Sequence, residues 1–275
     1  MTLALTGSSG HLGGRVATLL ADLSPILLVR DASRAPSVAG SEVRVASYEP
    51  EAAAALEGVD TLFMVSGAEA VDRRDQHRAF IDAAAQAGVG HIVYTSFAGA
   101  APDADFTLGR DHADAEEAIK ASGMAYTLLR DNFYADLLPL FADEQGVLRG
   151  PAGDGRVAAV ARHDIADVAA VVLRDPASHA GSTYELTGPE ALTMTEVAAR
   201  AGAVLGRELS FHDETVDEAY ASRSSYGAEQ WQLDAWVSTY TAIRDGEVAR
   251  VTDDVERLTG HPARTLEQAL SGAAG

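Results

Sequence analysis

The sequence contains no cysteine, and this absence excludes several kinds of chemistry at once. Disulfide bonds, thiolate nucleophiles and cysteine-ligated metal sites are all ruled out. No stretch approaches the roughly 20 consecutive apolar residues of a membrane-spanning helix. Residues 1–6 have a strand pattern rather than that of a secretion signal. We therefore expect a cytoplasmic protein without a membrane span.

Positive charge is also scarce. The chain has 21 Lys and Arg residues against 41 Asp and Glu, a formal net charge of −20, and Lys120 is its only lysine. A chain with this balance repels nucleic-acid phosphates and anionic lipid surfaces. We expect no nucleic-acid partner and no membrane partner, but a small-molecule substrate. The sequence carries no readable interface signal, so both a monomer and a homodimer are open.

The chain has 275 residues, of which 47% are hydrophobic, enough for a large core and a smaller second domain. In its first half, short apolar runs alternate with helical patterns. The predicted strands are 3–6, 26–29, 43–46, 61–65, 91–95 and 126–129, and the predicted helices are 11–22, 50–57, 72–88 and 108–122. This alternation predicts an α/β fold, a Rossmann-type doubly wound parallel sheet with helices on both faces.

After Arg130 the rhythm changes to shorter elements. A strand-like run covers 157–162, a strand covers 183–188, and helices are predicted at 163–174, 193–205, 214–223, 226–244 and 265–271. We interpret 1–131 as the larger α/β domain, to which 156–188 return. Residues 132–155 and 189–275 then form a small C-terminal α+β domain.

Three glycines mark the turn after the first strand. Gly7, Gly10 and Gly13 follow an apolar run and precede an amphipathic helix. In this context the first glycine makes the turn, the second lets a pyrophosphate approach the backbone, and the third lets helix and strand pack closely. The helix N-terminus adds unpaired N–H groups and a positive dipole end. The pattern predicts a dinucleotide site.

The end of the second strand bears on coenzyme choice. An acidic residue there holds a ribose 2′-hydroxyl, whereas an arginine suits a 2′-phosphate. The run "ILLV" ends in Arg30, with Arg34 nearby, which favours NADPH. Asp31 is adjacent to Arg30 and leaves NADH possible.

Six segments in a fixed order carry a resemblance to a known family. They are "TGSSGHLG", "LLVRDASRA", "VYTSFAGA", "YTLLRDNFY", "GPAGDGRVAAVARHDIADVAA" and "YELTGPEALTMTEVA". The chain resembles the NmrA-like, atypical branch of the short-chain dehydrogenase/reductases. Within it, the chain is most similar to the type 2 NAD(P)H:quinone oxidoreductases and to triphenylmethane reductase. The resemblance implies an NADPH-dependent enzyme that transfers hydride to a quinone or similar conjugated aromatic acceptor. It also implies that 1–131 form the NAD(P)-binding domain and that the small C-terminal domain binds the substrate.

The resemblance also implies which residues bind ligands. The implied cofactor residues are Gly7, Ser9, Gly10, His11, Leu12, Gly13, Arg30, Ser66, Gly67, Thr95, Ser96, Phe97 and Phe133. The implied substrate residues are Phe97, Asn132, Tyr134 and Trp231. Tyr134 is the candidate hydroxyl near the acceptor oxygen, and His112 is a second candidate catalytic residue.

The Tyr-x-x-x-Lys pair of the wider superfamily is missing. Alignment on Glu116 puts Leu108 at the position of the tyrosine and His112 at that of the lysine, and Lys120 lies too far along the helix to substitute. Reduction of a simple ketone gives an alkoxide that needs a placed acid. A hydroquinone anion has a phenol-like pKa, near the roughly 10 of tyrosine, and needs little help. A quinone, cationic dye or polycyclic aromatic ketone therefore suits this site.

Two other functions remain open from the sequence. The chain suits a tailoring reductase or monooxygenase for a polycyclic aromatic polyketide, and it also suits a non-catalytic NmrA-like regulator that senses dinucleotides. No metal site is expected, because His163 and Asp164 open a predicted helix, where Asp164 faces the helix dipole. His77 is predicted to be a surface or interdomain residue. Ser96 near His112 lacks the third group of a hydrolase.

Overall fold

The computed structural model describes residues 1–272, which divide into two compact units. Unit 1 consists of Met1–Phe97, Asp111–Arg130 and Ile165–Tyr184. Unit 2 consists of Ala98–Arg110, Asp131–Asp164 and the chain from Glu185 onward. The segments of the two units interleave, so each unit is built from residues that are far apart in sequence.

A seven-stranded sheet forms the centre of unit 1, and two of its strands continue into segments of unit 2. Its strands are β1 (Leu3–Leu5), β2 (Ile26–Val29), β3 (Val43–Val45), β4 (Thr61–Met64), β5 (His91–Phe97), β6 (Ala125–Asp131) and β9 (Ser182–Leu186). The strand order is β3-β2-β1-β4-β5-β6-β9. The pairs β1–β2, β2–β3, β1–β4 and β4–β5 are parallel. The predicted doubly wound Rossmann-type fold is confirmed.

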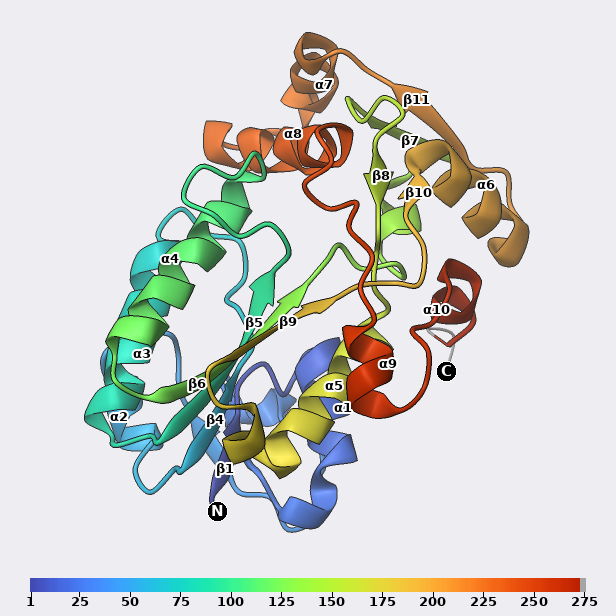
Figure 1. Cartoon of the computed structure of the whole chain (residues 1–275). Coiled ribbons are helices and arrows are strands. Elements are labelled where there is room, and N and C mark those ends of the chain that lie inside the picture. The colour runs from blue at the N-terminus through green and yellow to red at the C-terminus, as the bar shows by residue number, and fades with distance from the viewer. Residues whose placement is uncertain (273–275) are drawn as a thin grey trace. The chain divides into compact units, whose positions relative to one another are not determined.

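Helices cover both faces of this sheet. They are α1 (His11–Leu19), α2 (Ala52–Ala55), α3 (Arg73–Gln86), α4 (Thr107–Ala121) and α5 (Arg162–Arg174), with short 3₁₀ helices at Ala21–Leu23, Ala32–Arg34 and Pro176–His179. Figure 1 shows α2, α3 and α4 along one face and α1 with α5 along the other. Every residue of β1, β2, β4 and β5 is buried, as expected for parallel strands covered on both sides.

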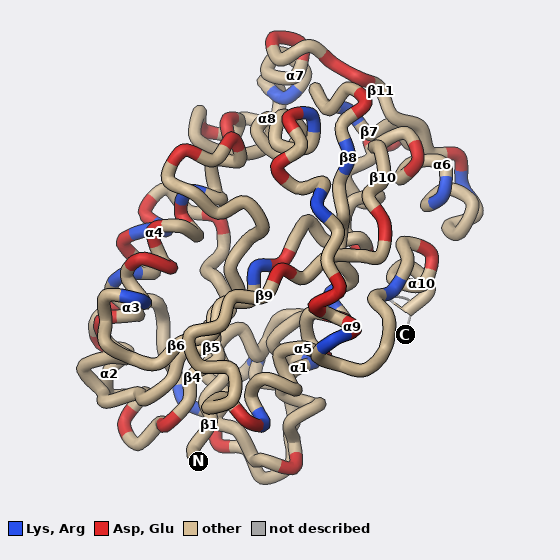
Figure 2. Tube along the Cα trace, in the orientation of Figure 1, with Lys and Arg blue, Asp and Glu red and all other residues tan. Residues whose placement is uncertain are grey.

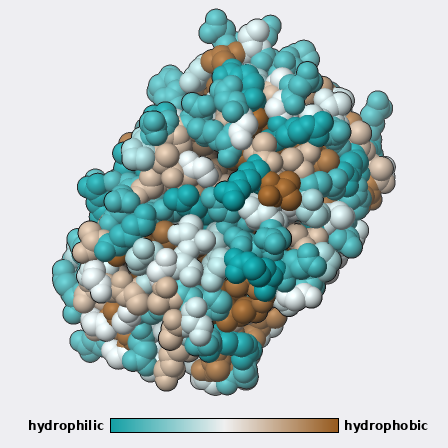
Figure 3. All heavy atoms as spheres, viewed as in Figure 1, coloured by the Kyte–Doolittle hydropathy of each residue, from teal (hydrophilic) through white to brown (hydrophobic). Residues whose placement is uncertain are grey.

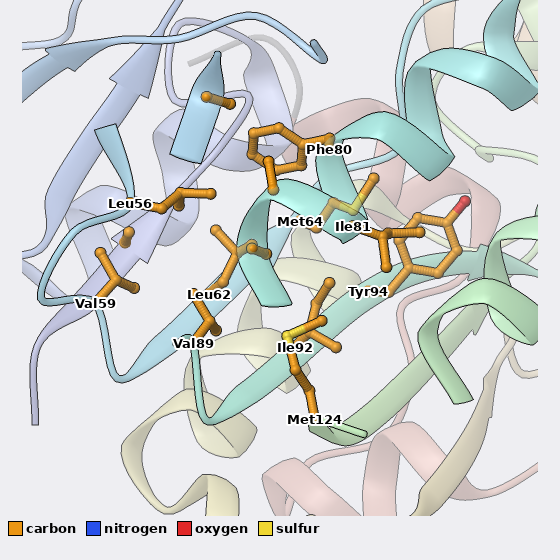
Figure 4. Packing of buried hydrophobic residues seen from close by; sticks show 14 of the residues in the cluster. Leu56, Val59, Leu62, Met64, Phe80, Ile81, Val89, Ile92, Tyr94 and Met124 are labelled. Carbon is orange, nitrogen blue, oxygen red and sulfur yellow. The ribbon is translucent and has the colours of Figure 1, made fainter. Parts of the chain in front are cut away.

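The core beneath α3 fixes this helix on the sheet. Phe80 and Ile81 of α3 are completely buried and belong to one hydrophobic cluster with Leu62 and Met64 of β4 (Figure 4). Burial of such side chains contributes about 1.5–3 kcal/mol each. Tyr94 of β5 joins the same cluster, so one polar hydroxyl is carried into a largely apolar layer.

Ion pairs connect the outer sides of α3 and α4. Arg74 Nε lies 2.6 Å from Asp111 Oδ1, and Arg78 pairs with Asp114. In Figure 2 blue segments of α3 accompany red segments of α4. Arg74 and Arg78 are half or more exposed, so these pairs stabilise the helix contact by only about 0–1 kcal/mol each.

Unit 2 contains two small sheets and the remaining helices. Its elements are β7 (Val147–Gly150), β8 (Arg156–Val157), β10 (Leu192–Thr193), α6 (Met194–Leu205), β11 (Ser210–Asp213), α7 (Val216–Arg223), α8 (Gln230–Arg244), α9 (Asp254–Thr259) and α10 (Leu266–Gly272), with 3₁₀ helices at Leu138–Phe141 and Ser224–Tyr226. Strands β7 and β11 pair in parallel, and β8 and β10 pair antiparallel. Thr193 and Thr215 start α6 and α7 with complete capping boxes.

The structure corrects some predicted boundaries. The helix predicted at 226–244 begins only at Gln230, because Gly227 has a φ of +67° and ends the preceding turn. Of the strand-like run 157–162, only Val157 lies in a strand, β8. Strands β7 and β11 and helix α9 were not predicted. Gly88 and Gly123, which follow α3 and α4, have positive φ, a conformation that favours glycine at a helix end.

The surface carries mixed polarity. The face drawn in Figure 3 is mostly hydrophilic, with small hydrophobic groups between the polar ones. Within residues 1–272, no helix combines the length and apolar character needed to cross a membrane.

Candidate functional site

The sheet of unit 1 reverses its winding between β1 and β4. β1 pairs with β2 on one side and with β4 on the other, so the chain builds outward in opposite directions from this point. In open α/β sheets, ligands bind beyond the carboxyl ends of the strands at such a switch point. The glycine turn follows β1, and the loop Val65–Gly67 follows β4. These two segments are therefore the candidate cofactor site.

The glycine turn has a backbone that side chains would obstruct. Gly7 has a φ of +64°, and a Cβ on it would lie 3.0 Å from the Val65 Cβ. A Cβ on Gly13 would lie 2.4 Å from the Gly7 carbonyl oxygen. Gly10 is the N-cap of α1, and no side chain caps the helix there. The first-turn N–H groups of α1 can therefore receive the phosphate oxygens of a dinucleotide.

The other residues of the turn differ in what they expose. Ser9 and His11 are exposed, whereas the Leu12 side chain is buried. Leu12 can thus meet a ligand only through its backbone. Ser8 is also buried, and its hydroxyl donates to the Leu5 carbonyl at 2.8 Å, which ties the turn to β1.

At the end of β2, Arg30 is exposed, whereas the Asp31 side chain is hydrogen-bonded to Ser33. The Asp31 carboxylate accepts hydrogen bonds from the Ser33 backbone N–H at 2.9 Å and from the Ser33 hydroxyl at 2.8 Å. These hydrogen bonds lower the pKa of Asp31. Asp31 thereby caps the following 3₁₀ turn, whereas Arg30 is exposed.

The loop after β4 is held by buried side chains. The Ser66 N–H donates to Thr95 Oγ1 at 2.8 Å, and the Gly67 N–H donates to His77 Nε2 at 2.8 Å. Thr95 lies in β5 and His77 in α3. A Cβ on Gly67 would lie 3.2 Å from His77 Nε2, so glycine lets the ring approach the backbone. Ser66, Gly67 and Thr95 therefore form one connected structure in unit 1.

His112 lies in a buried hydrogen-bond network of unit 1. Its Nε2 is 3.1 Å from an Arg73 guanidinium nitrogen, and its Nδ1 is 3.0 Å from the Tyr94 hydroxyl. A guanidinium only donates, so Nε2 accepts and the neutral ring carries its proton on Nδ1. Burial, followed by the charge of Arg73, holds the pKa of His112 well below its usual range. His112 is therefore neutral, with both ring nitrogens engaged.

The Ser96 side chain is engaged in a hydrogen bond within unit 1. It is fully buried, and its hydroxyl donates to Glu116 Oε1 at 2.6 Å. Arg130 donates to both Glu116 oxygens at 2.7 Å. Burial raises the pKa of Glu116, but hydrogen bonds from Arg130 and Ser96 outweigh burial and leave it lowered. Phe97 ends β5 with its ring centroid 6.0 Å from that of His112.

The candidate substrate residues belong mainly to unit 2. Asn132 is buried, donates to the Val248 carbonyl at 2.9 Å and accepts from the Phe133 N–H at 2.7 Å. The Phe133 ring packs edge-on against Phe106. Trp231, half-buried in the first turn of α8, donates to Glu229 at 3.0 Å. The amide of Asn132 is therefore committed to positioning the backbone.

Tyr134 is half-buried, and its hydroxyl donates to Asp131 Oδ2 at 3.0 Å. Burial, followed by the charge of Asp131, raises the pKa of Tyr134 well above its usual value. Its hydroxyl is therefore protonated at all physiological pH values.

Sequence reasoning missed two residues of α3. His77 was predicted at a surface or between domains, and this prediction was wrong, because its side chain is fully buried against Gly67. Arg73 was not singled out, yet it too is buried and binds the Gly67 carbonyl. Both residues lie on one face of α3, four positions apart, which is the signal that the sequence offered.

Comparisons with known proteins agree with this geometry. A family described as NAD(P)H-binding matches residues 7–176. Quinone oxidoreductase 2 of Escherichia coli (strain K12) is 34% identical over 280 residues, which cover 98% of this chain and 97% of that protein. NAD(P)H azoreductase of Xenophilus azovorans is 34% identical over 275 residues, with 97% and 96% covered.

Two solved structures share the whole fold. The crystal structure of an NADPH-dependent quinone oxidoreductase of Escherichia coli with NADPH has a TM-score of 0.89, is 32% identical and covers 100% of both chains. That of Citrobacter sp. triphenylmethane reductase with NADP(H) has a TM-score of 0.85, is 30% identical and covers 99% of this chain and 100% of that one. The resemblance inferred from the sequence is thus confirmed. The chain belongs to the NAD(P)H-binding family and is an NAD(P)H-dependent oxidoreductase.

Proposed function

We propose that this protein reduces a quinone, or a conjugated aromatic compound of similar chemistry, at the expense of NADPH. The bound coenzyme supplies a hydride. The protein supplies binding and orientation, which alone account for a large part of such rate accelerations. The names of similar proteins, a quinone oxidoreductase, an azoreductase and a triphenylmethane reductase, support a conjugated acceptor.

NADPH is favoured over NADH by the residues that follow β2. Arg30 is exposed and suited to a 2′-phosphate, whereas Ser33 donates two hydrogen bonds to Oδ1 of Asp31 and fixes that carboxylate in the following 3₁₀ turn. A ribose 2′-hydroxyl could donate only to the other oxygen, Oδ2, without displacing those hydrogen bonds. Both similar crystal structures contain the phosphorylated coenzyme, which supports the same choice.

The candidate residues divide by role. Gly7, Ser9, Gly10, His11, Leu12 and Gly13 would hold the pyrophosphate, Arg30 the adenosine phosphate, Ser66 and Gly67 the adenosine side, and Thr95, Ser96 and Phe97 the nicotinamide side. For Leu12 and Ser96 we expect only backbone contacts, because their side chains are buried within unit 1. Phe97, Phe133, Tyr134 and Trp231 remain the candidates for contact with an aromatic acceptor.

The acceptor class rests on one observation, the state of His112. Helix α4 contains no tyrosine, and His112 is neutral and bound to Tyr94 and Arg73 through both ring nitrogens. It therefore cannot deliver a proton without breaking a buried hydrogen bond. A simple ketone would yield an alkoxide that needs such a proton. A quinone yields a phenolate-like anion that water can protonate, so the site suits quinones.

The test is steady-state oxidation of NADPH, followed by nicotinamide absorbance, with matched acceptors. The panel contains a benzoquinone, a naphthoquinone, a triphenylmethane dye, an azo dye, and cyclohexanone as the simple ketone. We expect turnover with one or more conjugated acceptors and none with cyclohexanone. Fast turnover of cyclohexanone would disprove the inference that the site lacks a side chain able to protonate an alkoxide. Failure of every conjugated acceptor despite tight NADPH binding would disprove the acceptor class.

A further inference from the structure

Side chains hold nearly every backbone polar group of the loop Val65–Gly67. The Val65 N–H donates to Thr6 Oγ1 at 2.8 Å, and the Val65 carbonyl accepts from the Tyr48 hydroxyl. Thr95 accepts from the Ser66 N–H, and His77 accepts from the Gly67 N–H. The Gly67 carbonyl accepts from Arg73 Nε at 3.0 Å. Five of the six groups are thus tied to side chains.

The sixth group is the Ser66 carbonyl. Among residues 1–272, no partner is found for this oxygen, and Ser66 is half-buried at the switch point of the sheet. Backbone carbonyls are strong hydrogen-bond acceptors, so this oxygen is available to a donor from outside the loop. Because the rest of the loop is held by side chains, the Ser66 carbonyl has a fixed position in which it could accept from a ligand.

Arg73 connects this loop to α4. Its side chain is only 5% exposed, and its guanidinium donates to the Gly67 carbonyl, to His112 Nε2 at 3.1 Å and to Asp111 Oδ2 at 3.4 Å. The Asp111 carboxylate balances the buried charge. Three donors in a planar fork thus reach three acceptors, on the loop and on two neighbouring residues of α4.

We propose that Arg73 is a positioning residue for the coenzyme, which locks the loop Val65–Gly67 so that the Ser66 carbonyl accepts a hydroxyl or amino group of its adenosine half. The same guanidinium fixes His112 in its Nδ1–H form. The proposal rests on NAD(P)H binding and is independent of the acceptor. A lysine supplies the charge of Arg73, but its donors share a single nitrogen, so it could not reach all three acceptors at once.

The experiment measures binding of the adenosine half alone. Adenosine 2′,5′-bisphosphate, which carries no redox group, is titrated calorimetrically into wild type, Arg73→Met, Arg73→Lys and the matched control Arg74→Met. Arg74 is the adjacent residue of α3 and also binds Asp111, but it is half exposed. We expect Arg73→Met to weaken binding about tenfold, equivalent to about 1.4 kcal/mol. Arg73→Lys should recover part of this loss, and Arg74→Met should bind as wild type does.

Two spectroscopic measurements keep the proposal testable if Arg73→Met does not fold. In wild type labelled with ¹³C at serine carbonyls, saturation with the bisphosphate should shift the Ser66 resonance. The ¹⁵N spectrum of the imidazoles should show His112 as the Nδ1–H tautomer in wild type and a changed tautomer mixture in Arg73→Lys. An unshifted Ser66 carbonyl, or wild-type affinity in Arg73→Met, would overturn the proposal. Because no acceptor is used, these outcomes are separate from a failure to reduce quinones.

Discussion

Arg30 is the residue on which the choice between the two coenzymes should depend. It is exposed at the end of β2, and Oδ1 of the neighbouring Asp31 accepts two hydrogen bonds from Ser33. Hydrogen bonds to charged groups contribute about 1.5–3 kcal/mol. We therefore expect Arg30→Ala to weaken NADPH binding about tenfold to a hundredfold and to change NADH binding little. Calorimetric titration with both coenzymes measures the ratio directly.

The matched control for Arg30 is Arg174→Ala. Arg174 is an exposed arginine of unit 1 that pairs with Asp22 beyond the C-terminal end of α1, away from the glycine turn. The Arg174→Ala substitution should leave the affinities for NADPH and NADH unchanged. Equal losses of NADPH and NADH binding in Arg30→Ala would mean that Arg30 supports the fold rather than the 2′-phosphate. A selective loss in Arg34→Ala instead would transfer the role to Arg34.

For individual residues, the sequence allowed some roles to be predicted but did not reveal others. The glycine turn and Arg30 could be predicted because their roles follow from position relative to neighbouring strands. The commitments of Ser96 and Asn132 could not, because their partners Glu116 and Val248 lie 20 and 116 positions away. Whether a polar side chain is free for a ligand depends on such distant contacts, which only the folded chain brings together.

Among the elements, α1 depends on the absence of a side chain at Gly13. Alanine normally favours a helix over glycine by about 1 kcal/mol. Here the added Cβ would lie 2.4 Å from the Gly7 oxygen and 2.9 Å from the Thr6 oxygen. Both are backbone atoms, which cannot move away without distorting the turn. Overpacking of this kind costs about 1–3 kcal/mol. We expect Gly13→Ala to lower stability despite its better helix propensity, and to weaken NADPH binding by displacing α1.

The control for Gly13→Ala is Thr18→Ala, on the exposed face of the same helix. It also raises helix propensity but contacts no neighbouring backbone beyond its own turn. Urea unfolding followed by circular dichroism, together with NADPH titration, compares the two variants. A Gly13→Ala protein as stable as Thr18→Ala, with wild-type affinity, would show that the close approach of α1 to the turn is not required.

Strands were predictable where their residues are mostly apolar. The buried strands β1, β2 and β4 contain at most one polar residue each, so their burial could be predicted from the run alone. Strand β5 is buried throughout although it includes His91, Thr95 and Ser96. Strands β7 and β11 were missed because polar residues such as Arg149 and His212 interrupt their apolar pattern. Their pairing is parallel and joins distant segments, so no local turn announces it.

For the molecule as a whole, the buried histidines make stability depend on pH. Burial, followed by the charge of Arg73, lowers the pKa of His77 to about 3, and the same two causes lower that of His112. The polar side chains around His77 are those of Arg73, Tyr48, Tyr94 and His112. No other positive or negative charge is placed against its ring among the described residues.

The sign of the effect follows from proton binding. The unfolded chain, with histidine pKa values of about 6.5, binds more protons below that pH than the folded one. Stability is therefore complete above about pH 7 and falls as the pH decreases toward the folded pKa. For His77 alone the loss should reach about 2 kcal/mol by about pH 5, since each pH unit contributes up to about 1.4 kcal/mol.

His77→Gln isolates this contribution, because the glutamine oxygen can still accept from the Gly67 N–H but does not titrate. Urea unfolding is measured at about pH 8 and about pH 5 for wild type, His77→Gln and the exposed control His212→Gln. We expect the pH-dependent loss in His77→Gln to be smaller than in wild type by about 2 kcal/mol, and unchanged in His212→Gln. The buried Nδ1–H of His77 has no hydrogen-bond partner among residues 1–272, so removing the ring should not sacrifice a second polar contact. If His77→Gln loses as much stability on acidification as wild type, His77 is protonated in the folded protein. The inference that His77 stays neutral beside the buried Arg73 would then be wrong.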